Sequence, residues 1–141
     1  MEVKIVETNN EKEDAYRVRR DVFIEEQGVT EEEEHDGLDE VAVHFVGYEN
    51  DIPVAAARLR IMDTYGKLER ICVTKEHRGR SFGKDIILKM EEYVAKQGRD
   101  VSKLNAQTRA EGFYQSLGYQ TTSGEFMDAD IPHVAMEKSF K

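Results

Sequence analysis

A strand, a basic loop and an amphipathic helix follow one another between residues 68 and 94, and this order constrains the fold more than any other feature of the chain. Residues 68–73 end in β-forming side chains and predict a strand. Apolar residues then recur at every fourth position, as on one face of a helix: Phe82, Ile86, Met90 and Val94. The loop Lys75–Lys84 therefore precedes a helix N-terminus, where unpaired N–H groups and the helix dipole favour an anion. We expect this loop to bind phosphate.

The charges of this loop agree with an anionic ligand. The loop contains Lys75, Arg78, Arg80 and Lys84 against Glu76 alone, in a chain whose formal net charge is −9. It lacks the Gly-Lys-Ser/Thr ending of a P-loop and the three glycines of a dinucleotide-binding loop. Taken alone, the loop is equally compatible with an exposed turn built around a glycine.

Periodicity and turn residues predict the element order β-α-β-β-β-α-β-α-β-β. The expected strands cover residues 3–6, 41–46, 53–61, 68–73, 101–106, 119 onward and 132–138, and the expected helices cover residues 11–26, 82–97 and 110–117. Asn10 is the expected cap of the first helix. Residues 30–39 predict an acidic loop with one helical turn. The strand, crossover helix and strand between residues 68 and 106 require a parallel pair, so we expect an α/β or α+β fold with a mixed sheet.

The chain of 141 residues fits one domain, and it contains no linker or repeat, so we expect a single domain over residues 1–141. No apolar run approaches the ~18 residues of a membrane span, and the N-terminus lacks a secretion signal. These features predict a cytoplasmic protein that does not bind membranes. Cys72 is the only cysteine, and the four histidines show no ligand spacing, so we expect neither a disulfide nor a metal site.

The motif Arg78-Gly-Arg-Ser-Phe-Gly83 resembles the acetyl-coenzyme A (acetyl-CoA) loop of the Gcn5-related N-acetyltransferases, the GNAT family, whose pattern is Gln/Arg-x-x-Gly-x-Gly/Ala. Arg78 and Gly83 match the first and last positions, and Ser81 stands where the middle glycine is expected. Serine is small, and its hydroxyl group is expected to cap the helix or to contact a phosphate. Whether the replacement weakens CoA binding stays open.

A second segment, Gln107–Tyr119, resembles the other cofactor segment of the family, Asn-x-x-Ala-x-x-Phe-Tyr-x-x-x-Gly-Phe/Tyr. Gln107 replaces the Asn and keeps an amide. Residues 17–27, 68–73, 104–107 and 131–136 further resemble the ElaA/YjcF-type branch of small bacterial acetyltransferases. The resemblance covers essentially the whole chain. It implies the GNAT fold: a central mixed sheet of about seven strands, splayed between the fourth and fifth, with about four helices.

The resemblance also implies where acetyl-CoA, the cosubstrate, would lie. The main chain of Ile71, Cys72 and Val73 would pair with the pantetheine arm in the split of the sheet, while the Cys72 thiol is buried on the opposite face. Asn105 and Gln107 would orient the pantetheine amides, and Phe113 and Tyr114 belong to the same site. The pyrophosphate would be held by the N–H groups of Arg78, Gly79, Arg80, Ser81, Phe82, Gly83 and Lys84.

Amine acetylation needs an acid for the departing thiolate and a base for the amine. The resemblance places the family's general-acid tyrosine at Tyr114; the alternative is a purely apolar role in its helix. Glu69 is one candidate base, expected by strand alternation to share a face with Ile71 and Val73. It would need a raised pKa, and an ion pair with an arginine would lower that pKa instead. His133 is the other candidate base, because imidazole titrates near neutrality, and a structural role is the alternative.

Acidic residues are concentrated between Asp21 and Ala57, where 12 Asp or Glu side chains occur without any Lys or Arg. The rest of the chain has 17 acidic and 20 basic residues, or +3. The overall acidity argues against nucleic-acid binding. In the GNAT family this region borders the acceptor site. Two interpretations stay open: a negative rim that attracts a cationic amine, or a solvated loop that serves solubility.

The expected function is transfer of the acetyl group of acetyl-CoA to a primary amine, on a small molecule or a protein. The alternative is a non-catalytic CoA-binding or protein-interaction module on the same fold. A flavodoxin-type protein fits less well, because the hairpin before residue 68 breaks strict strand–helix alternation. The final strand at residues 133–138 could pair between subunits of a homodimer.

Overall fold

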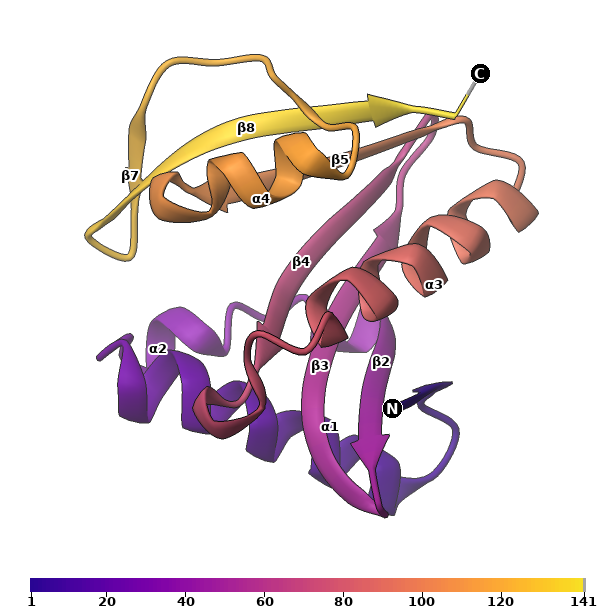
Figure 1. Ribbon diagram of the computed structural model, residues 1–141, viewed down its shortest axis with the longest axis vertical. Coiled ribbons are helices and arrows are strands. Elements are labelled where there is room, and N and C mark those ends of the chain that lie inside the picture. The colour runs from indigo at the N-terminus through magenta and orange to yellow at the C-terminus, as the bar shows by residue number, and fades with distance from the viewer. Residues whose placement is uncertain (141) are drawn as a thin grey trace.

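The computed structural model describes residues 1–140 as one mixed sheet with helices on both faces (Figure 1). The strands are β1 (Glu2–Ile5), β2 (Val43–Glu49), β3 (Ile52–Ile61), β4 (Gly66–Val73), β5 (Val101–Gln107), β6 (Gln120–Thr121), β7 (Phe126–Asp128) and β8 (Ile131–Ser139). The α-helices are α1 (Asn9–Arg19), α2 (Glu31–Glu34), α3 (Phe82–Lys96) and α4 (Glu111–Ser116). The strand order is β1-β2-β3-β4-β5-β8-β6, and β7 also pairs with β8. The expected mixed sheet is confirmed.

The sheet splits between β4 and β5. These parallel strands are paired only where Gly66–Leu68 meets Ser102–Leu104, and beyond that point they diverge (Figure 1). A β-bulge lies at the divergence, because the register with β3 shifts between Ala56 and Arg58 and Arg70 has a φ of +54°. A bulge bends and twists its strand, so it turns β4 away from β5. The expected split between the fourth and fifth strands is confirmed.

Each face of the sheet has its own apolar cluster. The stripe of α3 packs on one face, so close to β4 that a β-carbon at Gly66 would lie 2.3 Å from a methyl carbon of Val94. On the other face, Ala15 and Val18 of α1 pack with Cys72 of β4. β4 is therefore held between two helices, which positions it beside the split.

The first helix differs from its expected form at both ends. Its cap is Thr8 rather than Asn10, because the Thr8 hydroxyl accepts from the Glu11 N–H and the Glu11 carboxylate accepts from the Thr8 N–H, both at 3.1 Å. The α-helix ends at Arg19 and continues as a π-helical segment, η1 (Arg20–Glu26). The expected single turn in the acidic loop is confirmed as α2, which Thr30 caps. Three short 3-10 helices complete the chain: η2 (Asp39–Val41), η3 (Lys75–His77) and η4 (Thr108–Ala110).

The final strand has a partner on each side. β8 pairs with β5 along one edge and with β6 and β7 along the other. The expectation that this strand pairs between two subunits is therefore wrong, because its hydrogen-bonding edges are used within the chain. Among residues 1–140, no helix is long and apolar enough to cross a membrane.

Candidate active site

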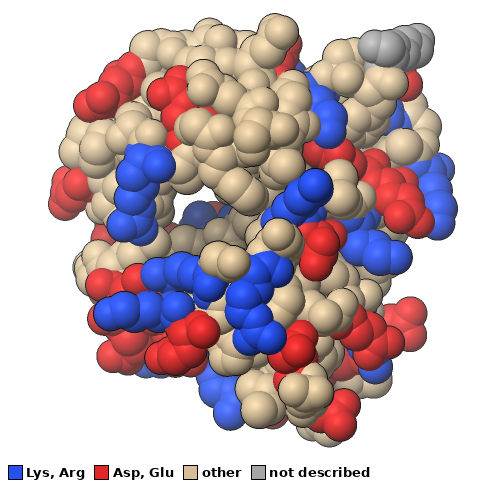
Figure 2. All heavy atoms as spheres, viewed as in Figure 1, with Lys and Arg blue, Asp and Glu red and all other residues tan. Residues whose placement is uncertain are grey.

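A cavity of about 750 Å³ occupies the split. β4 forms one wall, β5 and α4 form the other, and the loop before α3 closes one end. Figure 2 shows its mouth as a hollow on one face, with Lys and Arg side chains along the lower rim. The cavity is lined by these residues that the sequence predicted for the site: Glu69, Ile71, Cys72, Val73, Arg78, Gly79, Ser81, Phe82, Gly83, Asn105, Gln107, Phe113, Tyr114 and His133. Arg80 and Lys84 are exposed and do not line it.

In the loop before α3, Ser81 has a positive φ angle, a backbone conformation that glycine usually adopts. Ser81 is the N-cap of α3 with φ +65°, and its side chain makes no capping hydrogen bond, so the expected capping role is wrong. This left-handed conformation favours glycine, which explains the glycine of the family pattern at this position. Gly79 also has a positive φ, +80°. The helix N-terminus itself stays open to an anion.

Two consecutive residues at the end of η1 connect both walls of the split. Glu26 accepts two hydrogen bonds from the Arg78 guanidinium, each at 2.6 Å. Gln27 accepts one from the Gln107 amide at 2.9 Å, and the Arg109 guanidinium donates to the Gln107 oxygen at 3.0 Å. The side chains of Arg78 and Gln107 are therefore already engaged.

Tyr114 lies on α4 at the inner wall of the cavity and is 9 % exposed. Its ring packs edge-on against Phe113 and Tyr119. Burial raises the pKa of Tyr114, and nearby Cys72 raises it further; no hydrogen bond among residues 1–140 contributes. The protonated phenol thus lines the cavity without a hydrogen-bond partner among residues 1–140.

Cys72 is buried, as expected, and its thiol donates to the Ala56 carbonyl oxygen at 3.7 Å. Burial raises the pKa of Cys72 to about 12. A thiol in this state is a poor nucleophile.

Glu69 lies on the opposite face from the expected one. The bulge at Arg70 shifts the alternation of β4, so Glu69 pairs with Arg58 on the α1 face while Ile71 and Val73 pack on the α3 face. Burial raises the pKa of Glu69, but hydrogen bonds and charges from Arg60 and Arg58 outweigh burial and lower it overall. The ion-pair interpretation is the one observed, and a lowered pKa makes Glu69 a weak base.

His133 stands in β8, 8 % exposed, and its ring stacks on Phe126. Its Nδ1 lies 2.7 Å from the Ile131 carbonyl oxygen. Because a carbonyl oxygen only accepts, Nδ1 must carry a hydrogen, which leaves Nε2 as the acceptor of the neutral ring. His133 therefore has a structural contact through Nδ1, lines the cavity, and forms no hydrogen bond through Nε2 within residues 1–140.

Part of the acidic segment has a role within the fold that neither expected interpretation included. Buried Arg58 pairs with Asp36 at 2.8 Å and with Asp39 at 3.0 Å. Glu34, only 4 % exposed, pairs with Arg19 and with Arg70 at 2.5 and 2.9 Å. These arginines come from α1, β3 and β4, outside the acidic segment. Much of its charge is thus neutralised within the fold.

Residues 7–140 match the family model described as "Acetyltransferase (GNAT) domain". The chain is 45 % identical over 139 residues to the uncharacterized N-acetyltransferase YjcF of Bacillus subtilis, with 98 % of this chain and 99 % of YjcF covered. The chain belongs to the GNAT family. Among solved structures, ElaA of Escherichia coli superposes with a TM-score of 0.87 at 26 % identity, covering 98 % of this chain and 99 % of ElaA. An aminoglycoside 6'-N-acetyltransferase complexed with coenzyme A shares the fold, with a TM-score of 0.80 at 17 % identity and coverage of 100 % and 98 %.

The GNAT fold binds acetyl-CoA, and the split has the features that this ligand requires. From Glu69 to Val73, β4 pairs with no other strand of residues 1–140 on its β5 side, so its free N–H and C=O groups can pair with an extended amide chain. The Val73 carbonyl oxygen already accepts a hydrogen bond from Arg78 Nε at 3.0 Å. The open N-terminus of α3 can accept the pyrophosphate.

Several lining residues of this GNAT cavity escaped the sequence prediction: Phe23, Gln27, Lys67, Arg70, Arg109 and Asp128. Lys67 precedes the expected start of its strand, and Asp128 lies in a strand that no periodicity indicated. Phe23 lies in η1 and Gln27 directly follows it, and the position of η1 over the split depends on tertiary contacts.

Proposed function

We propose that the protein transfers the acetyl group of acetyl-CoA to a primary amine by direct attack in a ternary complex. The unpaired edge of β4 beside a cavity that Tyr114 lines carries this proposal. The raised pKa and burial of Cys72, the only cysteine, argue against a covalent cysteine intermediate.

In this reaction the amine nitrogen bonds to the thioester carbonyl carbon, and the carbon–sulfur bond breaks. The thiolate takes a proton from Tyr114, whose hydroxyl group stays protonated at neutral pH. Backbone N–H groups along Glu69–Val73 stabilise the carbonyl oxygen as it gains negative charge.

His133 accepts the amine proton, directly or through water. Two contrasts with Glu69 support this assignment. The His133 Nδ1 donates to Ile131 and leaves Nε2 as an acceptor, while Glu69 is bound by two arginines that lower its pKa. The pH profile separates the two, because loss of the base removes the acidic limb of kcat/KM.

The test is release of CoA thiol from acetyl-CoA over a panel of amines, with initial rates at several concentrations of both substrates. Intersecting lines are expected for a ternary complex, and parallel lines would refute it. Tyr114→Phe should lower kcat about 100-fold and leave the Kd for CoA unchanged. His133→Gln should flatten the acidic limb of the pH profile of kcat/KM, and Glu69→Gln should preserve that limb.

A non-catalytic CoA-binding module is the second candidate, favoured by the serine at a glycine-type position. Calorimetry distinguishes the two. CoA binding without turnover on the full amine panel would support the module, and no CoA binding at millimolar concentration would refute both.

A further inference from the structure

Three basic side chains occupy directly opposed positions at the closed end of the split. Arg60 of β3 is opposite Lys67 of β4, and Lys67 is opposite Lys103 of β5. Like charges at opposed positions destabilise a sheet. This row therefore needs compensating negative charge.

The two outer members of the row have that compensation within the fold. Arg60 donates two hydrogen bonds to Glu69, at 2.8 and 3.0 Å. Lys103 lies 3.8 Å from Glu137 and above the ring of Tyr65. The central member, Lys67, forms no ion pair within residues 1–140, although it is half-buried. Burial lowers the pKa of Lys67, Arg60 and Lys103 add to this shift, and the carboxylates of Glu69 and Asp128 oppose it.

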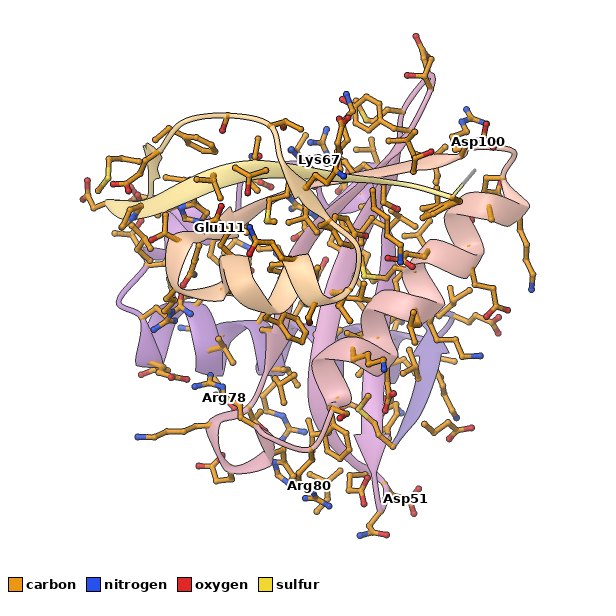
Figure 3. The ribbon with its side chains drawn as sticks, turned by 45° about the horizontal axis from the view of Figure 1, so that its top comes forward. Asp51, Lys67, Arg78, Arg80, Asp100 and Glu111 are labelled. Carbon is orange, nitrogen blue, oxygen red and sulfur yellow. The ribbon has the colours of Figure 1, made fainter. Side chains whose placement is uncertain are left out.

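Lys67 lines the cavity at the end away from the phosphate loop. Figure 3 shows it near β8, with Arg78 and Arg80 at the opposite end of the molecule. The cosubstrate would enter past Arg78 and occupy the free edge of β4 over Glu69–Val73. The Lys67 end of the cavity is then left for the acceptor.

The other charges on the cavity wall leave Lys67 available. Glu69, Arg70 and Arg78 are each held in ion pairs with residues of the fold. Arg109 also lines the cavity, and its guanidinium donates a hydrogen bond to the Gln107 side-chain oxygen at 3.0 Å. Asp128 of β7 also lines the cavity and has no ion pair within residues 1–140. The Asp128 carboxylate acts electrostatically on Lys67 without forming an ion pair with it. A cation and a carboxylate that both lack an ion-pair partner at this end suit a ligand that carries both charges.

We propose that Lys67 binds a carboxylate of the acceptor, which is therefore a small amine that also carries a carboxylate, such as an amino acid. This inference rests on the proposed acetyl transfer and specifies its acceptor. It excludes a polyamine as the preferred acceptor, because a second ammonium group would face Lys67.

Matched pairs of amines test the proposal: lysine and cadaverine, ornithine and putrescine, tyrosine and tyramine. Calorimetry measures their binding to the CoA-saturated protein, and thiol release from acetyl-CoA measures their turnover. We expect at least one carboxylate-bearing member to bind at least ten times more tightly than its decarboxylated partner. Lys67→Met should remove that preference, and Lys67→Arg should keep it. Lys103→Met is the matched control, because it removes a cation of the same row that does not line the cavity.

Any of four results would overturn the proposal. Within the pairs, these are equal binding in every pair, tighter binding of the decarboxylated members, or no binding of any carboxylate-bearing amine. The fourth is a preference for the carboxylate that survives in Lys67→Met. The two readouts separate it from the proposed function. Lys67-dependent binding without thiol release would refute acetyl transfer and keep the carboxylate site. Thiol release that favours the decarboxylated amines would do the reverse.

Discussion

Replacing Arg58 by methionine should destabilise the protein strongly. Arg58 is fully buried in the middle of β3 and hydrogen-bonds to Asp36, Asp39 and Glu69 at 2.8 to 3.1 Å. Methionine fills similar volume but leaves three partly buried carboxylates without their shared cation. Removing one partner of a buried ion pair costs about 3–5 kcal/mol.

The structure places the expected cost at the lower end of that range. Each of the three carboxylates keeps a second arginine: Asp36 keeps Arg70, Asp39 keeps Arg19, and Glu69 keeps Arg60. We expect a loss of about 3 kcal/mol in the free energy of unfolding. With an unfolding entropy of roughly 0.3 kcal/mol/K for 141 residues, this corresponds to a fall in Tm of about 10 °C.

Thermal and urea unfolding, followed by circular dichroism, measure this loss. Arg60→Met is the matched control, because Arg60 is 22 % exposed and pairs only with Glu69, which keeps Arg58. Its expected cost is below about 1 kcal/mol. A loss in Arg58→Met no larger than that in Arg60→Met would refute the assignment of the network as a buried scaffold.

Three further predictions can be tested with the same unfolding measurements and with the activity assay. Ser81→Gly should raise Tm by about 2 °C, because relief of a left-handed serine, about 1–2 kcal/mol, exceeds the unfolded-state entropy of glycine, up to about 1 kcal/mol; a lower Tm would contradict the strain. Tyr119→Phe should lower the free energy of unfolding by about 1.5–3 kcal/mol, because the Tyr119 hydroxyl donates a hydrogen bond to buried Glu91 at 2.8 Å. The same substitution should leave kcat unchanged. A loss of kcat as large as that in Tyr114→Phe would contradict the assignment of Tyr114 as the general acid. The contribution of Asp36 and Asp39 to stability should be constant above about pH 5 and decline below about pH 4. Burial raises the pKa of Asp36 and of Asp39, but arginine contacts lower both overall, so this contribution is present above the unfolded pKa and is lost as pH falls through the folded one. The difference between wild type and Arg58→Met should therefore shrink between pH 7 and pH 3, and a constant difference would exclude this linkage.

Local patterns predicted most elements of the fold, because each of these elements has its own apolar periodicity and its own turn or capping residues. The apolar stripe of α3 and the glycines that follow strands and helices suffice for their approximate bounds. The cap at Thr8 was missed although its signal is local: a threonine followed three residues later by Glu11 is a capping box. β6 and β7 were merged into one expected strand, because neither has enough residues for a period of two.

Side-chain orientation in β4 was beyond prediction for a different reason. Strict alternation places Glu69 with Ile71 and Val73, but the bulge at Arg70 reverses the phase. A bulge depends on contacts with neighbouring segments, and an arginine with φ +54° gives no local sign of it. Because of this reversed phase, Glu69, which the sequence predicted as a candidate base, forms ion pairs with Arg58 and Arg60.

The bulge also connects the acidic segment to the active site. Arg70, held at that positive φ, is bound by Glu34 at 2.9 Å and by Asp36 at 3.2 Å, and Asp36 also binds Arg58 on the neighbouring strand. The acidic segment thus forms ion pairs with both β3 and β4 at the point where β4 diverges from β5. Glu34 and Asp36 of the acidic segment are therefore structural partners of arginines that lie outside that segment.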